Sequence, residues 1–215
     1  MGDTLGTVTA GVYPGGYRRG ATSTDRWDQY VVPVRDRISS YKGRACSVRI
    51  PGIAGTTGQN ILSIFNADAT GVLVEVQKIF VDVMQTAAKV IEPPAIRIYR
   101  VSAAPTGGSA ITKAPLDTAL TSDTDIAVLQ GASAENTASA ITATTGALVS
   151  EEWAPRVLTL VGYETADRLF FLDDAPVLLR QSEGLLLRLD YSAAGANPVT
   201  DKWVCGVQWE EFTRP

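Results

Sequence analysis

From Ala45 onward, the chain is a succession of short segments that have the pattern of β-strands and are separated by turn residues. Each segment is rich in aliphatic, β-branched or aromatic residues, or alternates apolar and polar residues with a period of two. The predicted strands are Ala45–Ile50, Asn60–Asn66, Gly71–Thr86, Ala95–Val101, Thr124–Gln130, Val157–Tyr163, Arg168–Leu172, Pro176–Arg180, Gly184–Tyr191 and Lys202–Phe212. This spacing predicts an all-β fold, an antiparallel two-sheet sandwich of jelly-roll type.

The longest of these segments changes phase in its middle. Val74 and Val76 alternate with polar residues before Gln77-Lys78, whereas Ile79 and Val81 continue the apolar series afterwards on the opposite parity. One extra residue reverses the buried face of a strand, so the pattern predicts a β-bulge or bend there. Such a bend would let the strand cross from one sheet to the other. The predicted core includes Val74, Ile79, Val81, Ile98, Leu160, Phe170, Leu187, Leu189, Trp203 and Trp209.

The chain divides into a predicted N-terminal arm, residues 1–44, and a sandwich body, residues 45–215. The arm is rich in Gly, Arg and Tyr and has few clustered aliphatic residues, so it cannot bury a core of its own. Its aromatic residues favour an extended arm that lies on a partner surface. The predicted partner-binding residues are Tyr13, Tyr17, Arg18, Arg19, Trp27 and Tyr30.

Within the body, residues 103–150 consist largely of Ala, Thr, Ser and Gly. Few of these side chains are large enough to pack into a core, so this part is predicted to be an excursion from the sandwich. It would consist of small strands and loops, with a short helix possible over Ala134–Ala143.

Composition excludes the commonest enzyme chemistries. The chain has no histidine, which removes Ser-His-Asp and Cys-His arrangements and imidazole-bound zinc. Cys46 and Cys205 are too few for a thiolate metal site. They could form a disulfide only if their Cα atoms lay within about 7 Å, and two free buried thiols are the preferred interpretation. We therefore expect no enzymatic activity and no cofactor.

Charge and hydropathy bear on the kind of partner. The first 50 residues carry a net charge of +4 and the remaining 165 a net charge of −8. Because the body is acidic and four acids partly offset the bases of the arm, we expect contact with another protein rather than direct contact with nucleic acid.

The apolar runs are far shorter than the roughly 18 residues of a membrane-spanning helix, so no membrane association is expected.

Acidic residues form the patterns that could provide a pair of catalytic carboxylates or a calcium site. The pairs Glu151-Glu152, Asp173-Asp174 and Glu210-Glu211 are predicted to lie on solvated edges or turns, because adjacent residues of a strand point to opposite faces. Asp123-Thr124-Asp125 has the alternating acids of a calcium loop but lacks its glycine and terminal glutamate. We therefore predict no metal site.

Three stretches resemble virion proteins of tailed bacteriophages. They are IRIYRVSAAPTGGSAITKAPLDTAL (residues 96–120), PVLLRQSEGLLLRLDY (residues 176–191) and WVCGVQWEEF (residues 203–212). This pattern is similar to the β-sandwich decoration, or cement, proteins of phage heads. It covers parts of the body and none of the arm, and it includes no catalytic signature.

The resemblance implies a structural role on the capsid surface of a virion. Decoration proteins commonly form trimers and clamp neighbouring shell subunits, often through an extended arm. The expected partners are the major capsid protein and other virion proteins. Three alternatives stay open: another virion position (tail, fibre, collar or head–tail connection), a carbohydrate-binding sandwich, and a glycan hydrolase that uses two carboxylates.

Overall fold

The computed structural model describes residues 16–18, 27–29, 38–47, 50–51, 58–85, 95–131, 140–153, 164–165, 169–172, 175–190 and 202–213. The chain divides into two compact units, residues 1–38 with residue 215 and residues 39–214. In the first unit, β1 (Gly16–Arg18) pairs with β2 (Trp27–Gln29) in an antiparallel hairpin. Arg18 stands opposite Trp27 in its register.

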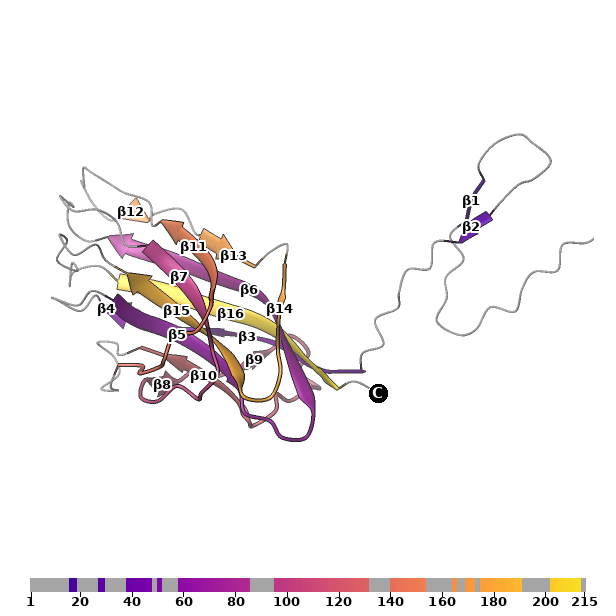
Figure 1. Cartoon of the computed structure of the whole chain (residues 1–215), viewed down its shortest axis with the longest axis horizontal. Helices are drawn as coiled ribbons and strands as arrows, with labels where there is room; N and C mark the ends of the chain where they lie inside the picture. Colours follow the sequence, from indigo (N-terminus) through magenta and orange to yellow (C-terminus); the bar gives the residue numbers. More distant parts are fainter. Residues whose placement is uncertain are drawn as a thin grey trace, which may run out of the picture. The chain divides into compact units, whose positions relative to one another are not determined.

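The second unit contains a six-stranded and an eight-stranded sheet, which face each other (Figure 1). The six-stranded sheet has the order β11 (Leu148–Trp153), β7 (Ala95–Val101), β15 (Glu183–Asp190), β5 (Gly58–Asn66), β10 (Ile126–Gln130) and β8 (Ser109–Ala110). The eight-stranded sheet runs β12 (Glu164–Thr165), β6 (Val72–Gln85), β16 (Lys202–Thr213), β3 (Ile38–Cys46) and β9 (Ala114–Pro115). β13 (Leu169–Phe171) and β14 (Val177–Leu179) pair with β6, and β4 (Ile50–Pro51) pairs with β16.

The predicted all-β sandwich is confirmed. The strand pairings in both sheets are antiparallel, and the described residues include no helix. The jelly-roll topology and the extended arm stay predictions.

The core lies between the two sheets, and both contribute to it. Of the predicted core residues, eight are at most 1% exposed: Val74, Ile79, Val81, Ile98, Leu187, Leu189, Trp203 and Trp209. Leu160 and the side chain of Phe170 lie outside the described residues. Leu185, Leu187 and Leu189 belong to the same core cluster, as the period-two pattern of their strand predicts.

The predicted bulge in β6 is also confirmed. Lys78 pairs with Gln208 and Val76 pairs with Trp209, so Gln77 has no residue opposite it in β16. Because Gln77 is an extra residue in the strand, the apolar side chains before and after it face the same side of the sheet. Both halves of β6 therefore bury their Val and Ile side chains in one core. All of β6 stays in the eight-stranded sheet, so the expected crossing between sheets is wrong.

The outer face of the six-stranded sheet carries a second, smaller core. The sequence pattern assigns Leu186 to a polar face, yet Leu186 is fully buried together with Phe65, Val101 and Ile141. The burial comes from residues 140–147, here called the strap, which carry Ile141 onto this face. Leu129 and Ala143 pack against the same cluster.

The strand at the start of the body begins earlier than the sequence predicts. The structure assigns residues 38–46 to β3, so this strand begins seven residues before the predicted start at Ala45 (45 − 38). The division into an arm, residues 1–44, and a body stays a prediction. Tyr41, Gly43 and Ala45 are buried, but two of these three inward-facing residues are small, so the sequence shows little apolar alternation. Cys46, the residue after Ala45, is exposed and free, whereas Cys205 is free and buried, so burial of both thiols is wrong.

Residues 103–150 are only partly an excursion. β10 and the first half of β11 lie within this range, and both strands are full members of the six-stranded sheet. β8 pairs with β10 and β9 with β3, so the short segment between β8 and β9 passes from one sheet to the other. The predicted helix Ala134–Ala143 lies mostly outside the described residues, and residues 140–143 are not helical. The predicted strand Val157–Tyr163 lies outside them as well.

Candidate functional site

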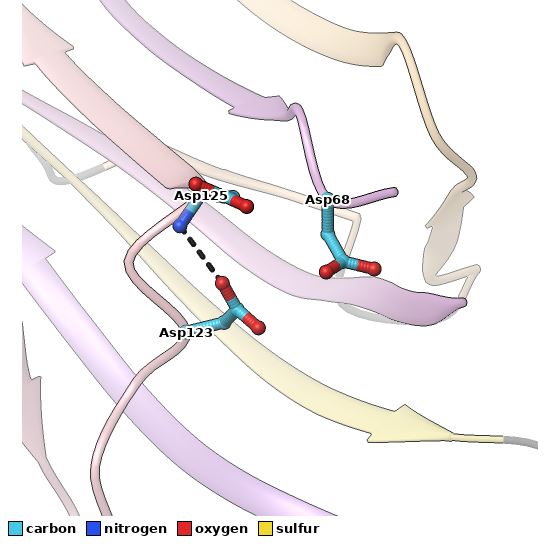
Figure 2. Close-up of side chains that lie close together, drawn as sticks. All are labelled: Asp68, Asp123 and Asp125. Carbon is cyan, nitrogen blue, oxygen red and sulfur yellow. Dashed lines mark hydrogen bonds between the residues drawn. The ribbon is translucent and has the colours of Figure 1, made fainter. Parts of the chain in front are cut away.

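Three aspartates from two turns form an acidic junction at one end of the sandwich (Figure 2). Asp68 lies in the turn between β5 and β6, and Asp123 and Asp125 precede β10. One carboxylate oxygen from each residue lies within 4.8 Å of the other two. The sequence singles out Asp123 and Asp125, but nothing in it places Asp68 beside them.

Asp68 is fixed by the turn that it closes. Its Oδ2 accepts hydrogen bonds from the backbone N–H of Thr70 (2.9 Å) and Val72 (2.7 Å), and its Oδ1 accepts one from the Thr70 hydroxyl (2.7 Å). Gly71 has a φ of 100°, a conformation that glycine adopts at little cost. The turn therefore depends on a buried carboxylate at its start and a glycine at its end.

These contacts set the charge state of Asp68. Burial by itself raises the pKa of a carboxyl group, but the hydrogen bonds from the Thr70 hydroxyl and from the backbone N–H groups of residues 70–72 outweigh burial. The net effect lowers the pKa of Asp68 below its ordinary value. Asp68 is therefore ionised at neutral pH although its side chain is buried.

The second turn is held by contacts on two sides. Asp123 Oδ1 accepts the backbone N–H of Asp125 (2.8 Å), and the Asp125 carbonyl accepts the N–H of Ala67 (3.0 Å). Glu211, which is buried in β16, accepts the backbone N–H of Asp123 (2.7 Å) and the hydroxyl of Ser122 (2.6 Å). The strand β16 thereby fixes the turn that carries two of the three aspartates.

A lysine lies close to the same turn. Lys113 Nζ donates to the carbonyls of Asp123 (2.6 Å) and Ile126 (2.8 Å). Burial lowers the pKa of Lys113, while the charges of Glu211, Asp123 and Asp125 act in the opposite direction. A positive charge on Lys113 partly balances the carboxylates of the junction.

Carboxylate oxygens are the ligands that a hard cation such as Ca²⁺ prefers, and such an ion takes roughly 6–8 of them. The junction supplies three carboxylates, and the oxygens of Asp68 already accept three hydrogen bonds. The hydrogen bonds within each turn, the Ala67–Asp125 backbone hydrogen bond and the positive charge of Lys113 together hold the two turns side by side. The expectation of no metal stays a prediction.

The other acidic pairs differ in their surroundings. Glu151 and Glu152 are exposed on β11, the edge strand of the six-stranded sheet, as predicted. Glu210 and Glu211 are buried, so a solvated edge or turn is wrong for this pair. Glu211 accepts the indole N–H of Trp209 (2.8 Å), and Glu210 accepts a hydrogen bond from Gln77 (3.2 Å). Asp173 and Asp174 lie outside the described residues.

The predicted partner-binding residues fall in the N-terminal unit. Tyr17 and Arg18 belong to β1 and Trp27 to β2. Tyr13, Arg19 and Tyr30 lie outside the described residues.

The two free cysteines differ in their surroundings. Burial raises the pKa of Cys205 to about 12, so this buried thiol is protonated at neutral pH. Cys46 is exposed, and histidine, the usual base for such a thiol, is absent from the sequence.

Comparison with protein-family models, with curated proteins and with solved structures found no match. Within the part of the chain that the structure describes, no helix has the length and apolar character needed to cross a membrane.

We expect Asp68→Asn to lower the free energy of unfolding by about 1–2 kcal/mol at pH 7, because the amide cannot replace both acceptor oxygens. The folded-state pKa of Asp68 is lowered, so its contribution is fully present above the unfolded pKa of about 3.9 and is lost as the pH falls through the folded pKa. Urea unfolding at pH 7, 5 and 3 should therefore show a constant difference between variant and wild type at the two higher values, and a smaller one at pH 3.

Asp117→Asn is the matched control for this prediction, because the Asp117 carboxylate accepts a backbone N–H in the same way but on the surface. We expect a change below about 0.5 kcal/mol for this control. An equal effect of both substitutions would contradict a special role of Asp68.

Proposed function

We propose that this protein is a non-enzymatic structural protein of a phage virion, which decorates and stabilises the capsid by bridging neighbouring shell subunits. In this proposal it acts as a trimer on the capsid surface. Its partners are the major capsid protein and other virion proteins.

The observation that carries the proposal is the separate N-terminal unit. Its described part is a hairpin of two strands with three residues each. An isolated two-stranded hairpin is only marginally stable in water, so contacts with another surface are the natural source of its stability. A segment of this kind, attached to a body with a complete core, is suited to bridging two subunits.

Two further features support the proposal. The N-terminal segment is rich in Tyr, Trp and Arg, the residue types that contribute most to binding at protein interfaces. The resemblance of residues 96–120, 176–191 and 203–212 to decoration proteins points to the same role. Binding to the assembled shell would then raise the stability of the particle by mass action.

The test compares the heat stability of three kinds of particle: particles with the complete protein, particles without it, and particles with a variant that lacks residues 1–37. This deletion leaves β3 complete. We expect both altered particles to release their DNA at a lower temperature than intact particles.

Point variants identify which contacts matter. Exposed ion pairs contribute little individually, so Tyr17→Ala with Trp27→Ala should lower the release temperature more than Arg18→Ala with Arg19→Ala. An unchanged release temperature together with lost attachment to the host would overturn the proposal. That outcome would favour the alternative role in a tail, fibre, collar or head–tail connection.

A further inference from the structure

The strap, residues 140–147, is held to the six-stranded sheet by one large side chain. Ile141 is 3% exposed and packs against Phe65, Val101 and Leu186. The other strap residues are Ala, Thr and Gly, and most of them are exposed. Apolar burial of the strap therefore depends mainly on Ile141.

A small set of hydrogen bonds attaches the strap at its two ends. Thr142 and Thr106 exchange two backbone hydrogen bonds of 2.8 and 2.9 Å. Near the other end, Gly146 donates to the Arg100 carbonyl and Arg100 donates to the Ala147 carbonyl, both at 2.8 Å. The Asn60 side-chain amide donates to the Ile141 carbonyl at 2.9 Å.

Two buried polar atoms lie on the face that the strap covers. Ser63 stands between Leu129 and Leu186 in the register of the sheet and is 1% exposed. Neither its Oγ nor the Oδ1 of Asn60 has a hydrogen-bond partner among the described residues. Burial without a partner costs such an atom its hydration, and that cost is recovered when water reaches the atom.

We infer that the strap is a conformational device that opens as a unit while the sandwich stays folded. Opening loses the burial of Ile141 and the hydrogen bonds at the two ends, but it returns water to Ser63 and Asn60. Segments with few buried apolar contacts open at lower free energy than the core. The open state exposes the second core of Phe65, Val101, Leu129 and Leu186. This inference is independent of the proposed function.

Amide hydrogen exchange on the full chain tests the opening directly. We expect the amides of Thr142, Gly146 and Arg100 to exchange at least about 100-fold faster than that of Leu187 in β15. Their exchange should also depend little on low urea concentrations, because local opening exposes little surface. Exchange of these three amides with the same protection and the same urea dependence as Leu187 would overturn the inference.

Side-chain variants test the physical cause. Ser63→Ala removes a buried hydroxyl without a partner, so we expect exchange at Thr142 and Gly146 to slow about tenfold, which corresponds to about 1.4 kcal/mol. Ile141→Ala should speed exchange at these two amides at least about thirtyfold. The control is Ser102→Ala, which changes an exposed serine next to Val101 and should leave both rates unchanged. Unchanged exchange in Ser63→Ala would contradict the role given to the buried hydroxyl.

A reversible lock adds a second measurement. Residues that exchange two hydrogen bonds in an antiparallel pair have Cα atoms about 5.5 Å apart, which suits a disulfide. In a Cys46→Ser background, Thr106→Cys with Thr142→Cys should slow exchange at Gly146 and Arg100 when oxidised, and reduction should restore it. Equal rates in the oxidised and reduced forms would show that the strap does not move as a unit. The exchange experiment on the unaltered chain decides the inference even if no bridge forms.

Discussion

Replacing Trp209 with alanine is expected to lower the free energy of unfolding by about 3–5 kcal/mol. Trp209 is fully buried in β16, and its ring centre lies 5.8 Å from that of Tyr41. Its indole N–H donates to Glu211 Oε1 at 2.8 Å. The substitution removes a large apolar side chain from between the sheets. It also removes the indole N–H that donates a hydrogen bond to the buried Glu211 carboxylate.

Urea unfolding followed by circular dichroism would measure this effect. Trp209→Phe keeps a ring but loses the N–H group, so its cost should fall well below that of Trp209→Ala. Trp27→Ala is the control in the N-terminal unit and should change the stability of the body by less than about 0.5 kcal/mol. A loss below about 1 kcal/mol for Trp209→Ala would contradict its role in the core.

The second large effect is expected at Glu211, where substitution by alanine should cost about 3–5 kcal/mol. The Glu211 carboxylate accepts hydrogen bonds from the Ser122 hydroxyl, the Asp123 backbone and the Trp209 indole. Its removal leaves the Asp123 backbone N–H and the Trp209 indole N–H short of an acceptor, and burial of these two donors is then no longer compensated. The Ser122 hydroxyl can still donate to the Asp123 carbonyl at 3.2 Å. The turn before β10 also loses its attachment to β16.

Two measurements separate this role from simple loss of side-chain volume. Glu211→Gln keeps the size but replaces an acceptor oxygen with a donor, so it should still cost about 1.5–3 kcal/mol. A double-mutant cycle of Trp209→Phe with Glu211→Gln should show a coupling of about 1 kcal/mol or more, since the two side chains share a hydrogen bond.

Glu210→Gln is the neighbouring control, because the Glu210 carboxylate accepts a weaker hydrogen bond from Gln77 and pairs with the half-exposed Lys42 at 3.6 Å. We expect it to cost less than Glu211→Gln. A larger loss at Glu210 would contradict the role given to Glu211 in attaching the turn before β10 to β16.

The sequence predicts the sandwich well wherever the alternation of a single strand carries the information. The period-two pattern of Leu185, Leu187 and Leu189 and the bulge at Gln77-Lys78 are both local properties, and both are confirmed. The sequence pattern predicts the start of β3 too late, because Gly43 and Ala45 are small and weaken the alternation, although Tyr41 is fully buried.

The candidate site was only partly predictable, because its parts come from distant segments. Asp68 meets Asp123 and Asp125 through the packing of two turns, and no local pattern in the sequence marks that meeting. Leu186 is buried by Ile141 of the strap, which lies 45 residues before it in sequence (186 − 141). Glu211 shows that a pair of adjacent acids on a strand need not be solvated, because one of the two can face buried donors.

The position of β16 between β6 and β3 limits how early the body can fold during synthesis on the ribosome. β3 is among the first strands of the body to be made, yet its neighbour β16 comprises residues 202–213, and the Ser47 backbone N–H donates to the Cys205 carbonyl across 158 positions of sequence. The middle of this sheet therefore cannot close until residues 202–213 have been synthesised. Pairings this distant in sequence form slowly, and strand edges that wait for them invite aggregation. The edges of β3 and β6 that face β16 therefore stay unpaired until residues 202–213 have been synthesised.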